Sequence, residues 1–136
     1  MTGQREALVN YVERWLRWAR EDLSLAEHTA HDPDVVARGA CMWAHQSAEK
    51  ALKALLVAQG IDPPKTHNLL YLERLMPSEV KDKLAVVDLV SLTRWAIEGR
   101  YPDDLDEATA ADAEASVLTA VDVLSLAEQA ALQLLR

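Results

Sequence analysis

Apolar positions recur at intervals of three and four residues through most of the chain, which is the period of an amphipathic helix. The pattern predicts five helices, at residues 6–28, 33–59, 67–76, 79–99 and 105–135. The intervals between them lack the alternation that marks a half-buried strand. We therefore expect an all-α fold, an up-down bundle of four long helices and one short helix.

Local signals predict where the second helix begins and ends. Asp32 followed by Pro33 is typical of an N-cap and a first helical residue. Gly60 is typical of the left-handed residue that follows a helix end. Gly39 costs about 1 kcal/mol relative to alanine inside a helix, so it indicates either a close approach of backbone or only the soft first turns of the helix.

Three further caps are expected downstream. Thr66 and Ser78 are placed to cap the third and fourth helices. Asp104 with Glu107 resembles a capping box for the last helix. Residues 61–65 contain two prolines and predict an extended connector.

An acidic residue interrupts the apolar stripe of the first helix. Asp22 lies four residues before Ala26 and three after Ala19, both of which belong to that stripe. A buried carboxylate needs a partner. Arg100, just after the predicted end of the fourth helix, is the partner that we expect.

Size and composition indicate one helical domain spanning residues 1–136. The chain has 4 glycines and 5 prolines, too few for the turns of an all-β fold, and half of its residues are hydrophobic. Cys41 is the single cysteine, which excludes an intrachain disulfide and is expected to be a small buried residue. With no apolar leader and no apolar run of membrane-spanning length, we expect a cytoplasmic protein that does not enter the membrane.

Charge is distributed unevenly. The formal net charge is −8, and residues 103–135 hold eight acids with no lysine or arginine. This balance argues against binding nucleic acid over the whole surface, and no DNA-specific binding is expected. It also predicts an anionic outer face on the last helix, a surface suited to a basic partner.

Four segments, which together span about 90 of the 136 residues, form a recognisable pattern. They are Trp15-Leu16 with Ala19, Asp22-Leu23 and Ala26; the run from Ala44 to Leu56; the run from Pro64 to Leu69; and Arg100-Tyr101-Pro102-Asp103. In this order they resemble the HEPN family, whose name refers to nucleotide-binding domains of higher eukaryotes and prokaryotes.

The resemblance implies a helical bundle that forms a homodimer, but it leaves two classes of function open. Some members are ribonucleases, often toxins, that use an Arg and a His spaced R-x(4 to 6)-H without metal. Others are encoded beside a minimal nucleotidyltransferase, or act as nucleotide-binding or scaffolding units. Neither class implies a cofactor or a metal site here.

Arg38 and His45 form the one pair at the nuclease spacing. Seven residues are nearly two helical turns, so both side chains share a face, about 10 Å apart along the axis. A histidine that titrates near neutral pH and an arginine that holds phosphate suit RNA cleavage. The pair lies early in the helix order, whereas the resemblance places it nearer the C-terminal half in enzymatic members. His45 is therefore interpreted first as a polar packing residue.

The second helix also carries a polar strip of Gln46, Glu49, Lys50 and Lys53. One interpretation is a solvated face with an ordinary Glu49–Lys53 pair. The other is that Glu49 and Lys50 support the connector to the third helix, or a dimer groove.

A phosphate site is the third hypothesis. Lys65 and His67 lie at a predicted helix N-terminus, where free N–H groups attract anions, and Arg100 could reach the same cleft. The structural alternative is that Thr66 only caps the helix and His67 bonds to the bundle. Trp15, Trp18 and Trp43 are interpreted as core or dimer anchors before base-stacking platforms.

The sequence thus favours a stand-alone, homodimeric module that binds a nucleotide or works with a nucleotidyltransferase, with membership of a toxin–antitoxin pair as one form of that role. Its predicted binding residues are Glu49, Lys50, Lys65, His67 and Arg100. The alternative is a metal-independent ribonuclease that cleaves RNA with Arg38 and His45.

Overall fold

The computed structural model describes residues 2–96 and 107–136. Its helices are α1 (Thr2–Ala30), α2 (Ala37–Ala58), α3 (Leu69–Arg74), α4 (Ser78–Leu84), α5 (Leu89–Thr93) and α6 (Ala110–Leu134). The described residues contain no strand, which confirms the all-α prediction. The lengths of the helices differ from the expected four long and one short, because three of these six are long and three are short.

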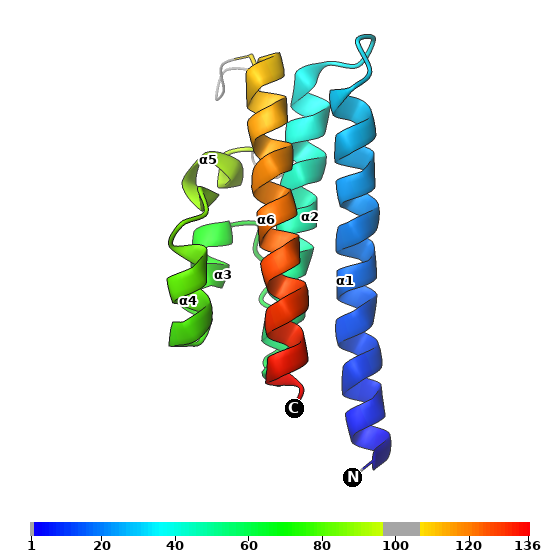
Figure 1. Ribbon diagram of the computed structural model, residues 1–136, viewed down its shortest axis with the longest axis vertical. Coiled ribbons are helices and arrows are strands. Elements are labelled where there is room, and N and C mark those ends of the chain that lie inside the picture. Colours follow the sequence, from blue (N-terminus) through cyan, green and yellow to red (C-terminus); the bar gives the residue numbers. More distant parts are fainter. Residues whose placement is uncertain (1, 97–106) are drawn as a thin grey trace.

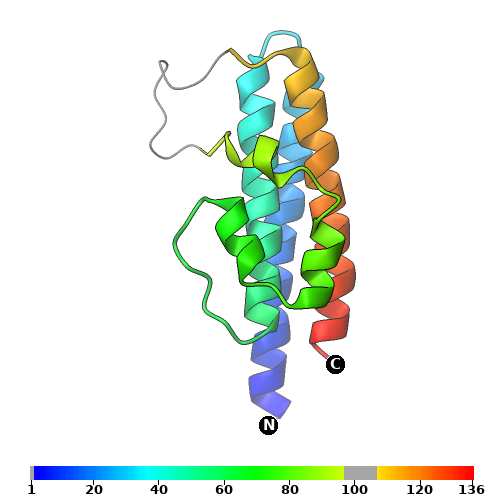
Figure 2. The same ribbon diagram turned by 90° about the vertical axis from the view of Figure 1, so that its left-hand side faces the viewer.

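The three long helices lie side by side, and the three short ones gather beside them (Figures 1 and 2). α2 occupies the middle of this arrangement, since it contacts α1, α6, α3 and α5. Every residue from 51 to 58 is buried, so this half of α2 is covered on all sides. Polar groups on α2 therefore need partners within the protein.

Small residues allow α1 and α2 to pack closely. Ala40 and Ala44 are fully buried, and Ser47 Oγ donates a 2.8 Å hydrogen bond to the carbonyl oxygen of Ala19. A Cβ atom added to Gly39 would lie 3.1 Å from the Thr29 side chain. Gly39 therefore lies in the first turn of α2 and faces a close side chain, not a close backbone segment.

The predicted start of the second helix was wrong by four residues. The Asp32 carboxylate accepts from the N–H of Asp34 at 2.9 Å, which makes a local turn in place of a helix cap. α2 begins at Ala37 and has no side-chain cap. Its end follows the prediction, because Gly60 has a positive φ of 78° just past the helix.

The predicted fourth helix is divided in two. Its aliphatic pattern continues through residues 85–87, but Asp88 then caps α5 by accepting from the N–H of Ser91 at 3.1 Å. A side chain that competes for backbone N–H groups ends one helix and begins another. Trp95 is buried as the apolar pattern required, and residues 97–99 lie outside the described ranges.

The last helix begins later than expected. Thr109 Oγ1 accepts from the N–H of Asp112 at 3.0 Å, and the Asp112 carboxylate accepts from the N–H of Thr109 at 2.9 Å. This is a full capping box for α6. Of the two residues predicted to form one, Glu107 precedes the helix and Asp104 lies outside the described residues.

α6 is long and apolar enough, by length and composition alone, to resemble a membrane span. Its mean hydropathy over 18 residues is 1.3, and 39% of that window is buried. Core helices of water-soluble domains often reach such values. Part of this apolar character belongs to residues that pack in the core of the bundle, among them Ala120, Val123 and Ala127.

Candidate functional site

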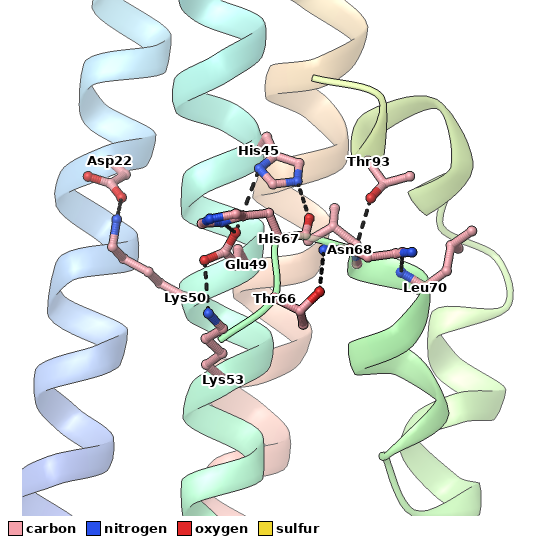
Figure 3. Close-up of polar contacts among 11 residues, drawn as sticks. Asp22, His45, Glu49, Lys50, Lys53, Thr66, His67, Asn68, Leu70 and Thr93 are labelled. Carbon is pink, nitrogen blue, oxygen red and sulfur yellow. Dashed lines mark hydrogen bonds and ion pairs between the residues drawn. The ribbon is translucent and has the colours of Figure 1, made fainter. Parts of the chain in front are cut away.

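The acid on the apolar stripe of α1 has a partner on α2. Asp22 is buried, with 8% exposure, and the Lys50 ammonium donates a hydrogen bond to its carboxylate (Figure 3). The carboxylate thus has the partner that its burial required. Arg100, the predicted partner, lies outside the described residues.

Glu49 is the centre of a buried polar cluster (Figure 3). One carboxylate oxygen accepts from the Lys53 ammonium at 3.0 Å, and the other accepts from His67 Nδ1 at 2.8 Å. Glu49 and Lys53 are 4% and 7% exposed. The pair is therefore buried rather than solvated. Through His67, Glu49 also joins α2 to residues 59–68, which we call the connector between α2 and α3.

His45 holds the same connector from a second side. It is fully buried, and its Nε2–H donates to the carbonyl oxygen of His67 at 2.8 Å. Because a carbonyl only accepts, Nε2 carries the proton, and Nδ1 faces Glu49 Oε1 at 4.0 Å. Burial lowers the pKa of His45, and the nearby Glu49 carboxylate opposes this in part. His45 is consequently neutral at pH 7.

Arg38 and His45 do not meet in the described structure. Arg38 is exposed near the start of α2, whereas His45 has no exposed surface. No hydrogen bond or ion pair joins the two within residues 2–96 and 107–136. A phosphodiester could contact His45 only if the covering connector moved.

Side chains of the protein accept hydrogen bonds from the first backbone N–H groups of α3. α3 begins at Leu69, two residues later than predicted, and its N-cap is Asn68, which accepts from the N–H groups of Leu70 and Tyr71. The N–H of Leu69 donates to Thr93 Oγ1 at 3.0 Å. The backbone groups predicted to bind phosphate are thus occupied.

Two of the predicted phosphate ligands, Lys65 and His67, lie among the residues that the structure describes. Lys65 is exposed on the connector, and His67 is held by Glu49. Thr66 was expected to cap α3 but accepts from the N–H of Asn68 at 3.1 Å instead. Arg100 is outside the described residues, so the predicted cluster is not seen as one site.

A pocket lies on the opposite side of Glu49, between α1 and α2. Its volume is about 370 Å³, within the range of small-molecule sites. α1 contributes three aromatic side chains and one cation, and α2 contributes two lysines and Glu49. The lining residues are Tyr11, Arg14, Trp15, Trp18, Glu49, Lys50 and Lys53. We call this the aromatic–cationic pocket.

The pocket combines exposed rings with positive charge. Tyr11 and Trp18 are 43% and 51% exposed, and the Tyr11 and Trp15 rings meet edge to face at 6.1 Å between centroids. Three cations and one acid line it, on a chain whose formal net charge is −8. Lys50 and Lys53 are ion-paired, and the structure gives Arg14 no ion pair within the described ranges.

Two of the predicted binding residues, Glu49 and Lys50, line this pocket. The prediction missed Tyr11 and Arg14, and it treated Trp18 first as an anchor. Tyr11, Arg14 and Trp18 are spaced by three and four residues, which places them together on α1. That spacing could have predicted that the three side chains share one face of α1. It could not have predicted that α2 places Lys50 and Lys53 beside this face.

Comparison with known proteins identifies the family. The HEPN domain matches residues 12–130, so the chain belongs to the HEPN family. Its structure is similar to that of TT1696 from Thermus thermophilus, with 30% identity, a TM-score of 0.73, and coverage of 89% of this chain and 98% of that one. It also resembles ST0689, an archaeal HEPN homologue, with 27% identity, a TM-score of 0.67, and coverage of 87% and 95%. No curated protein matches the sequence significantly.

Proposed function

We propose that this HEPN-family protein binds a nucleotide in the aromatic–cationic pocket. The observation that carries the proposal is the meeting of an aromatic surface on α1 with lysines from α2 around about 370 Å³. A nucleobase stacks on aromatic side chains, and such stacking contributes about 1–3 kcal/mol per base. Arg14, which has no ion pair among the described residues, can pair with a phosphate, and the paired ammonium groups of Lys50 and Lys53 can donate further hydrogen bonds to it.

Each side chain has a distinct expected role. Trp18 supplies an exposed ring for stacking, and Arg14 offers a planar, permanently charged phosphate ligand. Lys50 and Lys53 are fixed by Asp22 and Glu49, so they hold their places before a ligand binds. A fixed charge loses less conformational entropy when it binds.

The ribonuclease alternative has less support from the geometry. It needs Arg38 and His45 at one accessible surface, but Arg38 is exposed and His45 is enclosed. A nucleotidyltransferase partner and a toxin–antitoxin role stay predictions from the family resemblance. RNA cleavage in EDTA by the wild type, abolished in both Arg38→Ala and His45→Gln, would favour the enzyme instead.

Calorimetric titration with AMP, ATP and GTP tests the proposal. We expect saturable binding that Trp18→Ala weakens about tenfold, the effect of losing one stacking contact. Trp43→Ala is the matched control, because Trp43 is 39% exposed on α2 but does not line the pocket. No heat with any of the three nucleotides would contradict the proposal.

Two further sets of titrations distinguish binding in the pocket from binding at the connector. Adenosine and inorganic phosphate, titrated alone, report the contributions of the ring and of the cations. Lys65→Ala removes the exposed cation of the connector and should leave AMP affinity unchanged. If Lys65→Ala weakened AMP binding while Trp18→Ala did not, the ligand would bind at the connector.

A further inference from the structure

A second pocket lies among the three short helices, on the side of the bundle away from α1 (Figure 1). Its volume is about 420 Å³, which is within the range of small-molecule sites. α3 and α4 contribute three lining residues each, and residues 87–90, where α5 begins, complete the lining. It shares no residue with the aromatic–cationic pocket. We call it the short-helix pocket.

Part of this lining is aliphatic. Leu84 and Leu89 are 0% and 2% exposed, so they belong to the core as well as to the pocket. Val90, which also lines the pocket, is 66% exposed. An aliphatic group of a ligand that covers Val90 would remove apolar surface from water, which favours binding.

Two cations and two anions line the same pocket. Arg74, Lys81 and Asp88 are exposed, and Glu73 is half-buried. None of the four forms an ion pair within residues 2–96 and 107–136, although both signs of charge face one pocket. A ligand with a single charge would be attracted by two of these groups and repelled by the other two. A zwitterion can match both signs.

We propose that the short-helix pocket binds a free aliphatic α-amino acid, for which leucine is the probe. Its carboxylate pairs with Arg74 and Lys81, and its ammonium group pairs with Glu73 or Asp88. Its side chain packs on the aliphatic part of the lining. Charge-assisted hydrogen bonds of this kind are the stronger ones, and arginine can donate two of them to one carboxylate.

NMR of the ¹⁵N-labelled full chain, titrated with leucine, tests the proposal. We expect the backbone signals of residues 84–90 to shift and saturate, while the indole signals of Trp15 and Trp18 stay in place. Leucinamide lacks the carboxylate and N-acetylleucine lacks the ammonium group. Each should bind about tenfold more weakly than leucine, the effect of losing a hydrogen bond between charged groups. These derivatives mimic the first and last residues of a peptide, so they also separate a free amino acid from a peptide terminus.

Substitutions assign the two ends of the ligand. Arg74→Gln and Lys81→Gln should each weaken leucine binding several-fold and leave the affinity for leucinamide unchanged. Glu73→Gln should weaken the binding of leucine but not of N-acetylleucine. Lys83→Gln is the matched control, because Lys83 is an exposed cation on α4 that does not line the pocket.

Three results would overturn the proposal. One is the absence of a saturable shift with leucine. Another is N-acetylleucine or leucinamide binding as tightly as leucine, which would show that the pocket does not recognise both charges. The third is an equal loss of leucine affinity in Lys83→Gln and Lys81→Gln, which would indicate an effect of net charge alone. All of these results are independent of whether a nucleotide binds between α1 and α2.

Discussion

The two sides of Glu49 differ in whether their polar side chains are already bonded within the protein. Towards α3, His45 donates to the backbone of His67, the ring of His67 donates to Glu49, and Asn68 caps α3, so these polar groups serve the fold. Towards α1, Trp18 and Arg14 are exposed beside a pocket. The densest polar segment of the sequence is therefore mainly structural, and the surface suited to a ligand is more aromatic.

Glu49→Ala should give the largest loss of stability. It leaves the buried Lys53 ammonium without its carboxylate and releases the ring of His67, at a cost of about 3–5 kcal/mol. Urea denaturation measures the change. Glu13→Ala removes a carboxylate from the exposed pair with Arg20 and should cost about 0–1 kcal/mol. Equal losses of stability in the two variants would show that the Glu49 cluster stabilises the fold no more than an exposed ion pair does.

His45 should make stability depend on pH. Burial lowers its pKa in the folded protein, so the unfolded chain binds a proton more readily. Its stabilising contribution is complete above pH 6.5 and is lost as the pH falls towards the folded pKa, by about 1.4 kcal/mol per unit of pKa difference.

Thermal melts from pH 8 to pH 5 measure this contribution. His45→Gln removes the titration and keeps a donor for the carbonyl of His67, so its stability should depend less on pH. His28→Gln substitutes an exposed histidine and should retain the wild-type profile. A wild-type slope in His45→Gln would mean that other groups cause the dependence.

Asn68→Ala should have a smaller effect on the connector side. It removes the side chain that accepts from the first N–H groups of α3, at a cost of about 1 kcal/mol. Asn68→Ser retains an N-cap and should recover most of the loss. Denaturation midpoints compare the three proteins, and an Asn68→Ala midpoint equal to the wild type would show that this cap is dispensable.

Arg14→Ala should have the smallest effect on stability. Arg14 is exposed and has no ion pair among the described residues, so the change should stay within about 0.5 kcal/mol. AMP affinity should nevertheless fall several-fold. Arg17→Ala is the matched control for both measurements. If Arg14→Ala binds AMP as tightly as the wild type, Arg14 does not bind the nucleotide.

Helical periodicity predicted the fold class and much of the core. Ala19, Leu23 and Cys41 are buried where the pattern placed them, and Asp22 has the partner that its position demanded. The pattern failed where a short polar side chain competes for backbone N–H groups. Asp32 forms a turn instead of capping a helix, and Asp88 divides an aliphatic segment that is otherwise continuous.

The candidate site was only partly predictable. Glu49 and Lys50 stood out because they are polar residues on an apolar helix. Whether Glu49 is buried depends on the fold of the connector, which places His67 against it. Tyr11 and Arg14 become candidate ligands only when the packing of α1 on α2 fixes which face meets the lysines.

The indole N–H signals of the four tryptophans test the ligand site most directly. In a ¹⁵N-labelled sample titrated with AMP, the signals of Trp15 and Trp18 should shift together and saturate. Those of Trp43 and Trp95, which do not line the pocket, should stay in place. Shifts confined to the backbone N–H groups of residues 65–68, with Trp15 and Trp18 unchanged, would contradict binding between α1 and α2.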